Sequence, residues 1–249
     1  MMEAEWIGRD LKNNLKQGGM ADNQLVQHYI DIFMISNSCK GFVDGGKRFI
    51  CDLAVSTLME FEKENWICTE QRVNQFKSLI KKFKPDMAKL IEIPIVYSSH
   101  FTVYSINMYI SGGRLDIIDS RKYTKDYLFK TRAEYHSNVG PIMLKRIDEL
   151  LNVAYPSHNC PEFAEKFKEA KFPRCPKQTE NECAYSILRS IQWYNGDTIK
   201  CNQEEFSPSA IREEFNYKMI YGIENDLLDE LPEELRAFRP TVKEKYIPD

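Results

Sequence analysis

The sequence lacks the features that mark several specialised classes of protein. No apolar run approaches the length that crosses a bilayer, and the start, MMEAEWIGRDLKNN, has no basic segment followed by an apolar stretch. The 34 basic and 37 acidic residues form no cluster that resembles a phosphate-binding surface. We therefore expect a soluble, intracellular protein that binds neither a membrane nor nucleic acid directly.

A pattern of paired cysteines is also missing. The seven cysteines make an odd set, and no two stand at the CxxC spacing of a metal knuckle. Neither a disulfide framework nor a zinc site is indicated. Most of these thiols are expected to be buried or inert, and Cys183 stands in a different context.

What the sequence does contain is typical of a folded domain. Of its 249 residues, 43% are apolar and 29% charged. We expect one domain over residues 1–228, with a mainly helical part over about 1–88 and a part with a sheet over about 89–228. Residues 229–249 are charged, carry three prolines, and are expected to form a loosely held tail.

Hydrophobic spacing predicts an α+β fold, a small sheet flanked by helices. Within the helix expected over 183–194, an apolar stripe is predicted to be buried, whereas Ser186, Arg189, Ser190 and Gln192 are expected to face away. The expected helices cover 22–33, 51–61, 70–83, 139–153 and 183–194, with another opening at Ser207-Pro208, and the expected strands cover 91–96, 101–108, 114–118 and 167–172.

Cys183 begins a predicted helix, where unpaired backbone N–H groups and the helix dipole favour an anion. A thiol in that place tends towards the thiolate, which attacks carbonyl groups. From helix position alone, a small core residue is the more common interpretation, because cysteines at helix starts are common.

Three further residues are candidates for the same chemistry. His100 stands at a strand start and could accept the thiol proton. Asp119 closes a later strand, so a hairpin would bring its carboxylate beside the imidazole and orient it. Gln178, five residues before Cys183, could donate its amide to an oxyanion. Taken singly, these residues are also explained as a structural histidine, a turn aspartate and a loop glutamine.

The four candidate residues lie in three sequence segments, which occur in this order: IEIPIVYSSHFTVYSI, then RLDIIDS, then CPKQTENECAYSILRSIQWYNG. Their order resembles that of the SUMO-type ubiquitin-like-protein proteases, from about residue 10 to 222. In that family a His-Trp strand start, a strand ending in Asp-Ser and a Pro-x-Gln loop precede Asp-Cys-Gly. The sequence around Cys183 is most similar to variants of the family that are abundant in plant genomes, many of them associated with transposons.

The resemblance implies a papain-like cysteine protease fold of the ubiquitin-like protease type. It makes Cys183 the nucleophile, His100 the general base, Asp119 its orienting acid and Gln178 the oxyanion donor. The implied reaction is hydrolysis after the Gly-Gly end of a ubiquitin-like modifier, such as SUMO, without metal or organic cofactor. It implies a place in the nucleus or cytoplasm, and we take a monomer as the default.

Three positions depart from the family pattern. Phe101 and Met20 stand where tryptophans usually form a glycine-selective tunnel, so we expect these two residues to bind substrate. Ala184 replaces the glycine after the nucleophile. An alternative function is therefore a weak or inactive protease-like module that binds a ubiquitin-like protein. A helical and β protein unrelated to peptidases is a third interpretation.

Overall fold

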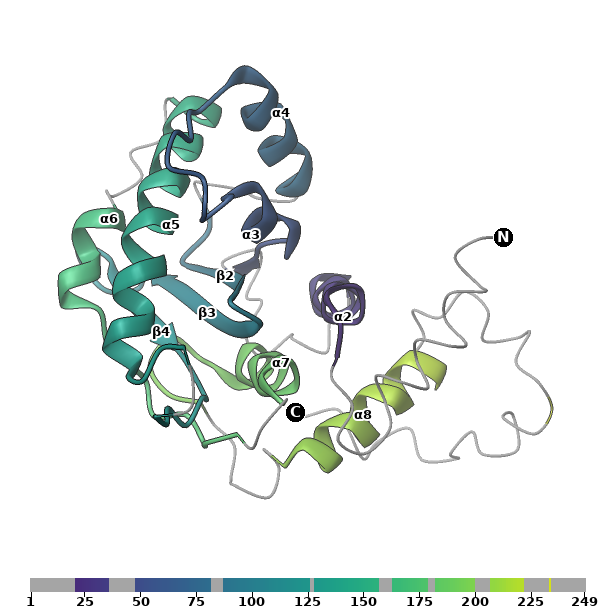
Figure 1. The fold of residues 1–249 in the computed structure, drawn as a ribbon. Coiled ribbons are helices and arrows are strands. Elements are labelled where there is room, and N and C mark those ends of the chain that lie inside the picture. The colour runs from purple at the N-terminus through teal and green to yellow at the C-terminus, as the bar shows by residue number, and fades with distance from the viewer. Residues whose placement is uncertain are drawn as a thin grey trace.

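A four-stranded sheet in the order β1-β2-β3-β4 forms the centre of the molecule (Figure 1). β1 (Arg48–Ile50) pairs in parallel with β2 (Leu90–Tyr97). β3 (His100–Asn107) and β4 (Arg114–Ile118) continue the sheet antiparallel, as the predicted meander. The computed structural model describes the following residues: 21–35, 48–81, 87–125, 128–156, 163–178, 182–199, 207–221 and 233.

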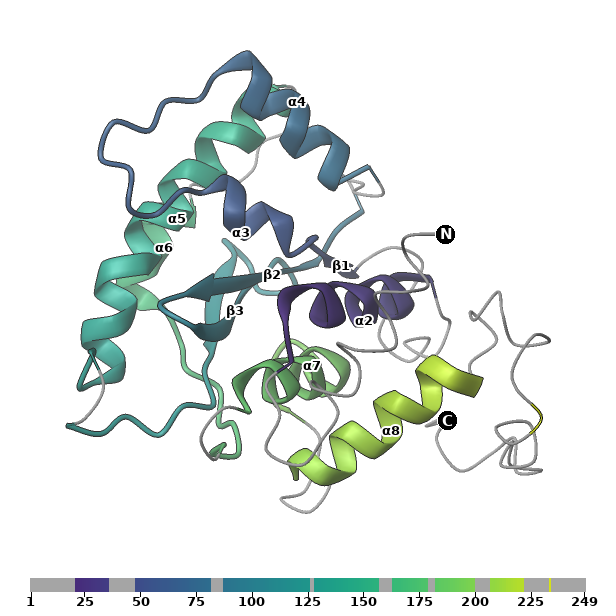
Figure 2. The same cartoon turned by 45° about the vertical axis from the view of Figure 1, so that its right-hand side comes forward.

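One face of the sheet is covered by three helices that are far apart in the sequence. α7 (Cys183–Trp193) contacts β3, α2 (Asn23–Ile35) and α8 (Pro208–Tyr221). Phe101 and Val103 of β3 belong to the apolar cluster that fills this side. Figure 2 shows α7 between the sheet and α8, with α2 beside it. α7 is therefore the buried element of this layer.

The opposite face of the sheet carries a second apolar cluster. Because side chains alternate along a strand, Tyr104 and Ile106 point away from α7 and join this cluster. The long α5 crosses it, and short helices pack around α5 (Figure 1). The helices on this side are α3 (Ala54–Leu58), α4 (Glu70–Leu79), α5 (Arg132–Ala154), α6 (Phe163–Lys166) and the 3₁₀ turn η3 (Phe167–Glu169).

The fold confirms the predicted α+β class, a small sheet flanked by helices. The predicted helices and the three strands of the meander are present, with shifted ends. α3 is shorter than the expected 51–61 helix, and α5 begins at Arg132, where the Thr131 side chain accepts a hydrogen bond from the Glu134 backbone N–H. The tail over 229–249 lies outside the described residues, apart from residue 233.

The predicted outward face of α7 is wrong. Ser186, Arg189, Ser190 and Gln192 are all buried. Arg189 and Gln192 are covered by α8, whose Glu214 lies 2.5 Å from the Arg189 guanidinium and accepts a hydrogen bond from Gln192 at 3.0 Å. Ser190 lies against Cys175, with its hydroxyl 3.6 Å from the Cys175 sulfur. A polar stripe on this helix therefore marks a buried polar interface rather than a solvated surface.

Two other predictions about the strands need correction. The expected strand over 167–172 is mostly the turn η3, and only Lys171 bridges to Asp116 of β4. β1 lies within the part predicted to be mainly helical. Three residues are too short to show an alternating pattern, so β1 is recognised by its pairing with β2. Within the described ranges, no helix combines the length and hydropathy that crossing a bilayer requires.

Candidate active site

A tight hairpin places His100 at the start of β3. Ser98 and Ser99 connect β2 to β3 with φ angles of 49° and 54°, and Tyr97 pairs directly with His100. Two successive positive φ angles are those of a type I′ turn, which non-glycine residues adopt with strain. Asp119 follows β4 one residue beyond Ile118, on the same side of the sheet as His100. The hairpin and the meander thus bring the two side chains together, as predicted.

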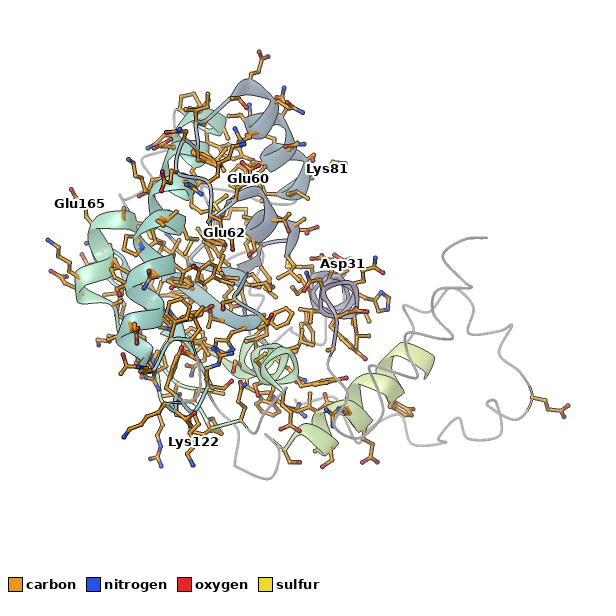
Figure 3. The ribbon with its side chains drawn as sticks, viewed as in Figure 1. Asp31, Glu60, Glu62, Lys81, Lys122 and Glu165 are labelled. Atoms are coloured by element: carbon orange, nitrogen blue, oxygen red, sulfur yellow. The ribbon has the colours of Figure 1, made fainter. Side chains whose placement is uncertain are left out.

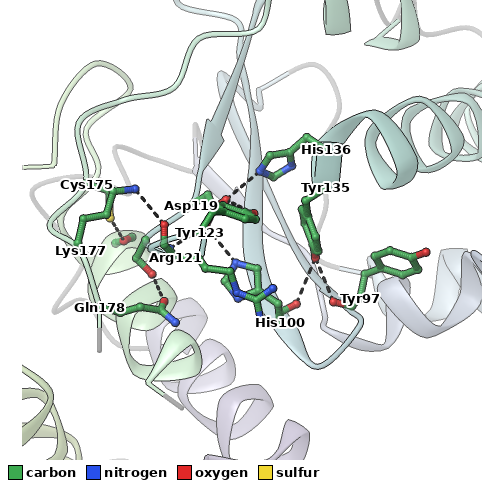
Figure 4. A network of polar contacts seen from close by, with 12 residues as sticks. Tyr97, His100, Asp119, Arg121, Tyr123, Tyr135, His136, Cys175, Lys177 and Gln178 are labelled. Atoms are coloured by element: carbon green, nitrogen blue, oxygen red, sulfur yellow. Dashed lines mark hydrogen bonds and ion pairs between the residues drawn. The ribbon is translucent and has the colours of Figure 1, made fainter. Parts of the chain in front are cut away.

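Asp119 is a buried carboxylate that accepts four hydrogen bonds (Figure 4). Its Oδ1 accepts from Nε2 of His100 at 3.0 Å and from the Arg121 backbone N–H at 2.9 Å. Its Oδ2 accepts from the Tyr123 hydroxyl at 2.7 Å and from Nε2 of His136 at 3.1 Å. Burial alone would raise the pKa of Asp119, but the hydrogen bonds from the two histidines outweigh it and hold this pKa well below its usual range. Asp119 is therefore ionised at neutral pH.

His100 has one ring nitrogen on Asp119 and the other free. Its Nδ1 is buried and has no hydrogen-bond partner among the described residues. The Tyr135 ring lies edge-on to the imidazole at 5.3 Å, and the Tyr135 hydroxyl donates to the carbonyl groups of Tyr97 and His100. Burial lowers the pKa of His100 despite the opposing effect of Asp119. The ring is therefore neutral at rest, oriented by Asp119, with a lone pair on Nδ1.

Cys183 occupies the first turn of α7, and 6% of it is exposed. Its thiol lies within reach of the backbone N–H groups of Phe101, Ala184 and Cys183 itself. Burial raises the pKa of the thiol, and these N–H groups partly offset the rise. Because Phe101 directly follows His100, the thiol lies at the start of β3. The resting state is then a neutral thiol at the start of the strand that carries the neutral His100 imidazole.

Gln178 lies in the segment that leads to α7, close to the loop after β4. Its backbone N–H donates to the Ser120 carbonyl at 3.0 Å, and the Ser120 hydroxyl donates to Oε1 of Gln178. The carboxamide oxygen is thus held, and its NH₂ group is left as the donor (Figure 4). Residues 179–181, which join this segment to α7, lie outside the described residues.

Of the two residues expected to bind substrate, only Phe101 lies within the described part of the chain. The Phe101 side chain is buried in the apolar cluster that includes Cys183. Met20 lies outside the described residues. Ala184, the departure next to the nucleophile, is buried in the same cluster.

Sequence reasoning missed two side chains that bind Asp119. Tyr123 follows it by four residues, and His136 comes from α5. The Arg121 N–H that closes onto Asp119 makes an Asx turn, a local signal that was available from Asp-Ser-Arg. Nothing in the sequence pairs His136 with Asp119, because helix α5 was expected to begin only at residue 139.

The charges of this site differ from those of the surface. Although two imidazoles and a carboxylate meet at Asp119, no group of three or more His, Cys, Asp or Glu side chains in the described part of the chain is arranged to hold a metal ion.

The charged side chains labelled in Figure 3 are all exposed: Asp31, Glu60, Glu62, Lys81, Lys122 and Glu165.

Solved structures identify the class of fold. Neither the protein-family models nor the curated proteins contain a match to this chain. Among solved structures, the fold is that of the Ulp1-like SUMO proteases. This confirms the fold that the resemblance implied.

The individual neighbours are distant in sequence. A SUMO protease Ulp1 with its catalytic cysteine oxidised to a sulfenic acid matches with a TM-score of 0.56 and 13% identity, over 83% of this chain and 80% of that chain. A de-sumoylating protease matches with a TM-score of 0.51 and 14% identity, over 84% and 78%. The Ulp1-like SUMO protease catalytic domain of Chaetomium thermophilum matches with a TM-score of 0.50 and 15% identity, over 86% and 78%. At these identities the likeness shows the fold.

Proposed function

We propose that the protein is a cysteine peptidase that cleaves the amide bond after the C-terminal Gly-Gly of a SUMO-like modifier. The observation that carries the proposal is the buried His100–Asp119 pair, with a free Nδ1 beside the strand start whose amide faces the Cys183 thiol. The fold shared with SUMO proteases supports the substrate class. The cell compartment proposed is the nucleus or the cytoplasm, and the family variant proposed is the plant type.

The first half of the reaction forms a thioester. Nδ1 of His100 takes the proton from Cys183 as Sγ attacks the carbonyl carbon of the last glycine. The NH₂ group of Gln178 and the backbone N–H of Cys183 stabilise the oxyanion. When the tetrahedral intermediate collapses, the C–N bond breaks and the amine leaves with the proton from His100. Asp119 holds the ring and stabilises the imidazolium throughout.

The second half releases the modifier. Nδ1 of His100 takes a proton from water, whose oxygen attacks the thioester carbonyl. The C–S bond breaks, Cys183 regains its proton from His100, and the modifier leaves as a carboxylic acid that gives its remaining proton to solvent. Phe101 and Met20 are the residues proposed to restrict the approach to glycine. No step uses a cofactor.

The test is turnover of ubiquitin-like proteins that carry a fluorescent amide at the C-terminus, with SUMO, NEDD8 and ubiquitin compared. We expect cleavage of a SUMO-like modifier that Cys183→Ala abolishes and Cys68→Ala, a matched change at a half-buried thiol, leaves intact. Folded protein that binds a modifier without cleaving it would instead establish a binding module. Undiminished turnover by Cys183→Ala would refute the assignment of the nucleophile.

A further inference from the structure

A second imidazole is bound to the orienting carboxylate. His136 reaches Asp119 from α5, opposite the oxygen that faces His100, with its Nε2 at 3.1 Å from Oδ2 (Figure 4). Its Nδ1 lies 2.7 Å from the Tyr104 hydroxyl on β3. His136 and Tyr104 are 1% and 0% exposed. A buried polar chain therefore runs from Tyr104 through His136 and Asp119 to His100.

The carboxylate sets the direction of two hydrogen bonds in this chain. An ionised Asp119 only accepts, so both histidines donate from Nε2. Burial raises the pKa of Tyr104 well above its usual value, so its hydroxyl keeps its proton. This hydroxyl is the partner of Nδ1 of His136, so both ring nitrogens of His136 form a hydrogen bond.

We propose that His136 is a positioning residue for the reaction assigned to Cys183: it donates from Nε2 to Oδ2 of Asp119 and so holds Oδ1 against His100. This inference rests on the proposed function. Without that donor, Oδ2 of Asp119 keeps the Tyr123 hydroxyl alone among the described residues, so the carboxylate is held less firmly and its negative charge is shared among fewer hydrogen bonds. Both effects act on His100, because His136 and His100 each donate a hydrogen bond to Asp119.

The local charges set the expected direction of the pH effect. Asp119 raises the pKa of His100, against the larger effect of burial. Losing the His136 donor leaves the Asp119 charge shared among fewer hydrogen bonds, so the pKa of His100 rises and the protonated, inactive ring persists to higher pH. Arg132 lies over the Phe172 ring, which contacts the His136 ring. In the described part of the chain, the other titratable or charged groups around Asp119 are Tyr104, Arg121, Tyr123, Tyr135 and Lys177, and Cys183 acts on Tyr135.

Two amide substitutions separate the two ring nitrogens. His136→Gln places its NH₂ group near the former Nε2 and keeps the donor to Asp119, whereas the shorter His136→Asn reaches only the former Nδ1. We expect His136→Asn to lower kcat by about 10- to 100-fold with KM unchanged, the range usual for a lost orienting hydrogen bond. The acid limb of kcat/KM should move to higher pH in His136→Asn and stay in place in His136→Gln.

A matched control measures the cost of losing a buried donor elsewhere. Tyr194→Phe removes a hydroxyl that donates to the buried Asp116 at 2.6 Å, so it should lower stability and leave the pH profile unchanged. Equal pH profiles and kcat in His136→Asn and His136→Gln would overturn the proposal and leave His136 a purely structural residue. ¹⁵N NMR of the wild-type imidazoles provides a reading that does not depend on variant folding. His136 protonated at Nδ1 rather than Nε2 would also overturn it.

A measurement without substrate separates this inference from the proposed function. The rate at which iodoacetamide alkylates Cys183 reports the proton equilibrium between the thiol and His100 at each pH. Its pH profile should shift in His136→Asn and not in His136→Gln. If the wild-type protein cleaves no modifier, and the alkylation profile still shifts in His136→Asn and not in His136→Gln, the proposed function alone is refuted. Cleavage of a modifier with identical alkylation profiles in both variants would refute the role of His136 alone.

Discussion

Two buried carboxylates, three residues apart, are held in chemically different ways. Asp116 in β4 accepts from Nε and Nη2 of Arg114 at 2.8 and 3.0 Å and from the Tyr194 hydroxyl at 2.6 Å. Asp119 is held by two imidazoles, a phenol and an amide N–H. A guanidinium keeps its charge at every accessible pH, whereas an imidazole exchanges protons near neutrality. Both carboxylates are buried, so their hydrogen-bond partners distinguish them. Asp116 stabilises the fold through an ion pair, whereas Asp119 orients an imidazole that can transfer a proton.

The largest expected effect is on turnover in Asp119→Asn. Its amide would face donors with an NH₂ group and misorient or mis-protonate His100, so kcat should fall about 10³- to 10⁴-fold. Asp116→Asn is the matched control and should keep near wild-type turnover while losing stability. Kinetics of both variants with a modifier amide check this. Equal losses in the two variants would remove the distinction between the carboxylates.

Arg114→Met should produce the largest change in stability. It leaves the Asp116 carboxylate, whose side chain is 0% exposed, without its cation, and breaking such a pair costs about 3 kcal/mol. Urea unfolding measures the free energy of unfolding, and turnover should stay near wild type. A variant as stable as wild type would show that the ion pair contributes nothing to the fold.

Activity and stability should both depend on pH through His100, the imidazole bound to Asp119. Burial lowers the pKa of His100 below its ordinary value of 6.5, and the neutral ring is the active form. Activity should therefore be full above that lowered pKa and fall as the pH drops through it. In the unfolded chain the ring takes its proton first, so stability from His100 falls as the pH drops below 6.5. A kcat/KM profile with an acid limb above 6.5 would contradict the assignment.

The smallest expected effects come from a pair of phenol deletions. Tyr123→Phe and Tyr194→Phe each remove one hydroxyl that donates to a buried carboxylate, and each should lower the free energy of unfolding by about 2 kcal/mol. Turnover should fall in Tyr123→Phe, because Asp119 loses a partner, and not in Tyr194→Phe. Thermal unfolding and kinetics of the two variants provide the check. A rate loss confined to Tyr194→Phe would reverse the comparison.

The sequence predicts the fold best where local pattern decides it. β2 could be predicted from its β-rich composition, β3 from a partial alternation and β4 from the Ser111-Gly112-Gly113 turn before it. The apolar stripe of α7 follows from its helical spacing. The His100–Asp119 pair could be predicted because it needs only a hairpin and a strand end. These contacts depend on neighbouring residues or on adjacent strands.

The rest depends on contacts between distant segments. The burial of Arg189 is created by Glu214 of α8, and β1 exists through its pairing with β2. His136 binds Asp119 because α5 begins before Pro141 and crosses the sheet at that point. Periodicity carries no information on which helix covers which polar side chain.

Mapping a covalent adduct tests the central claim most directly. The protein would be incubated with a SUMO-like modifier bearing a C-terminal electrophile, and the modified residue identified by mass spectrometry. We expect one adduct on Cys183, formed more slowly in Asp119→Asn and at an unchanged rate in Asp116→Asn. An adduct on the more exposed Cys68, or adduct formation that persists in Cys183→Ala, would contradict the account.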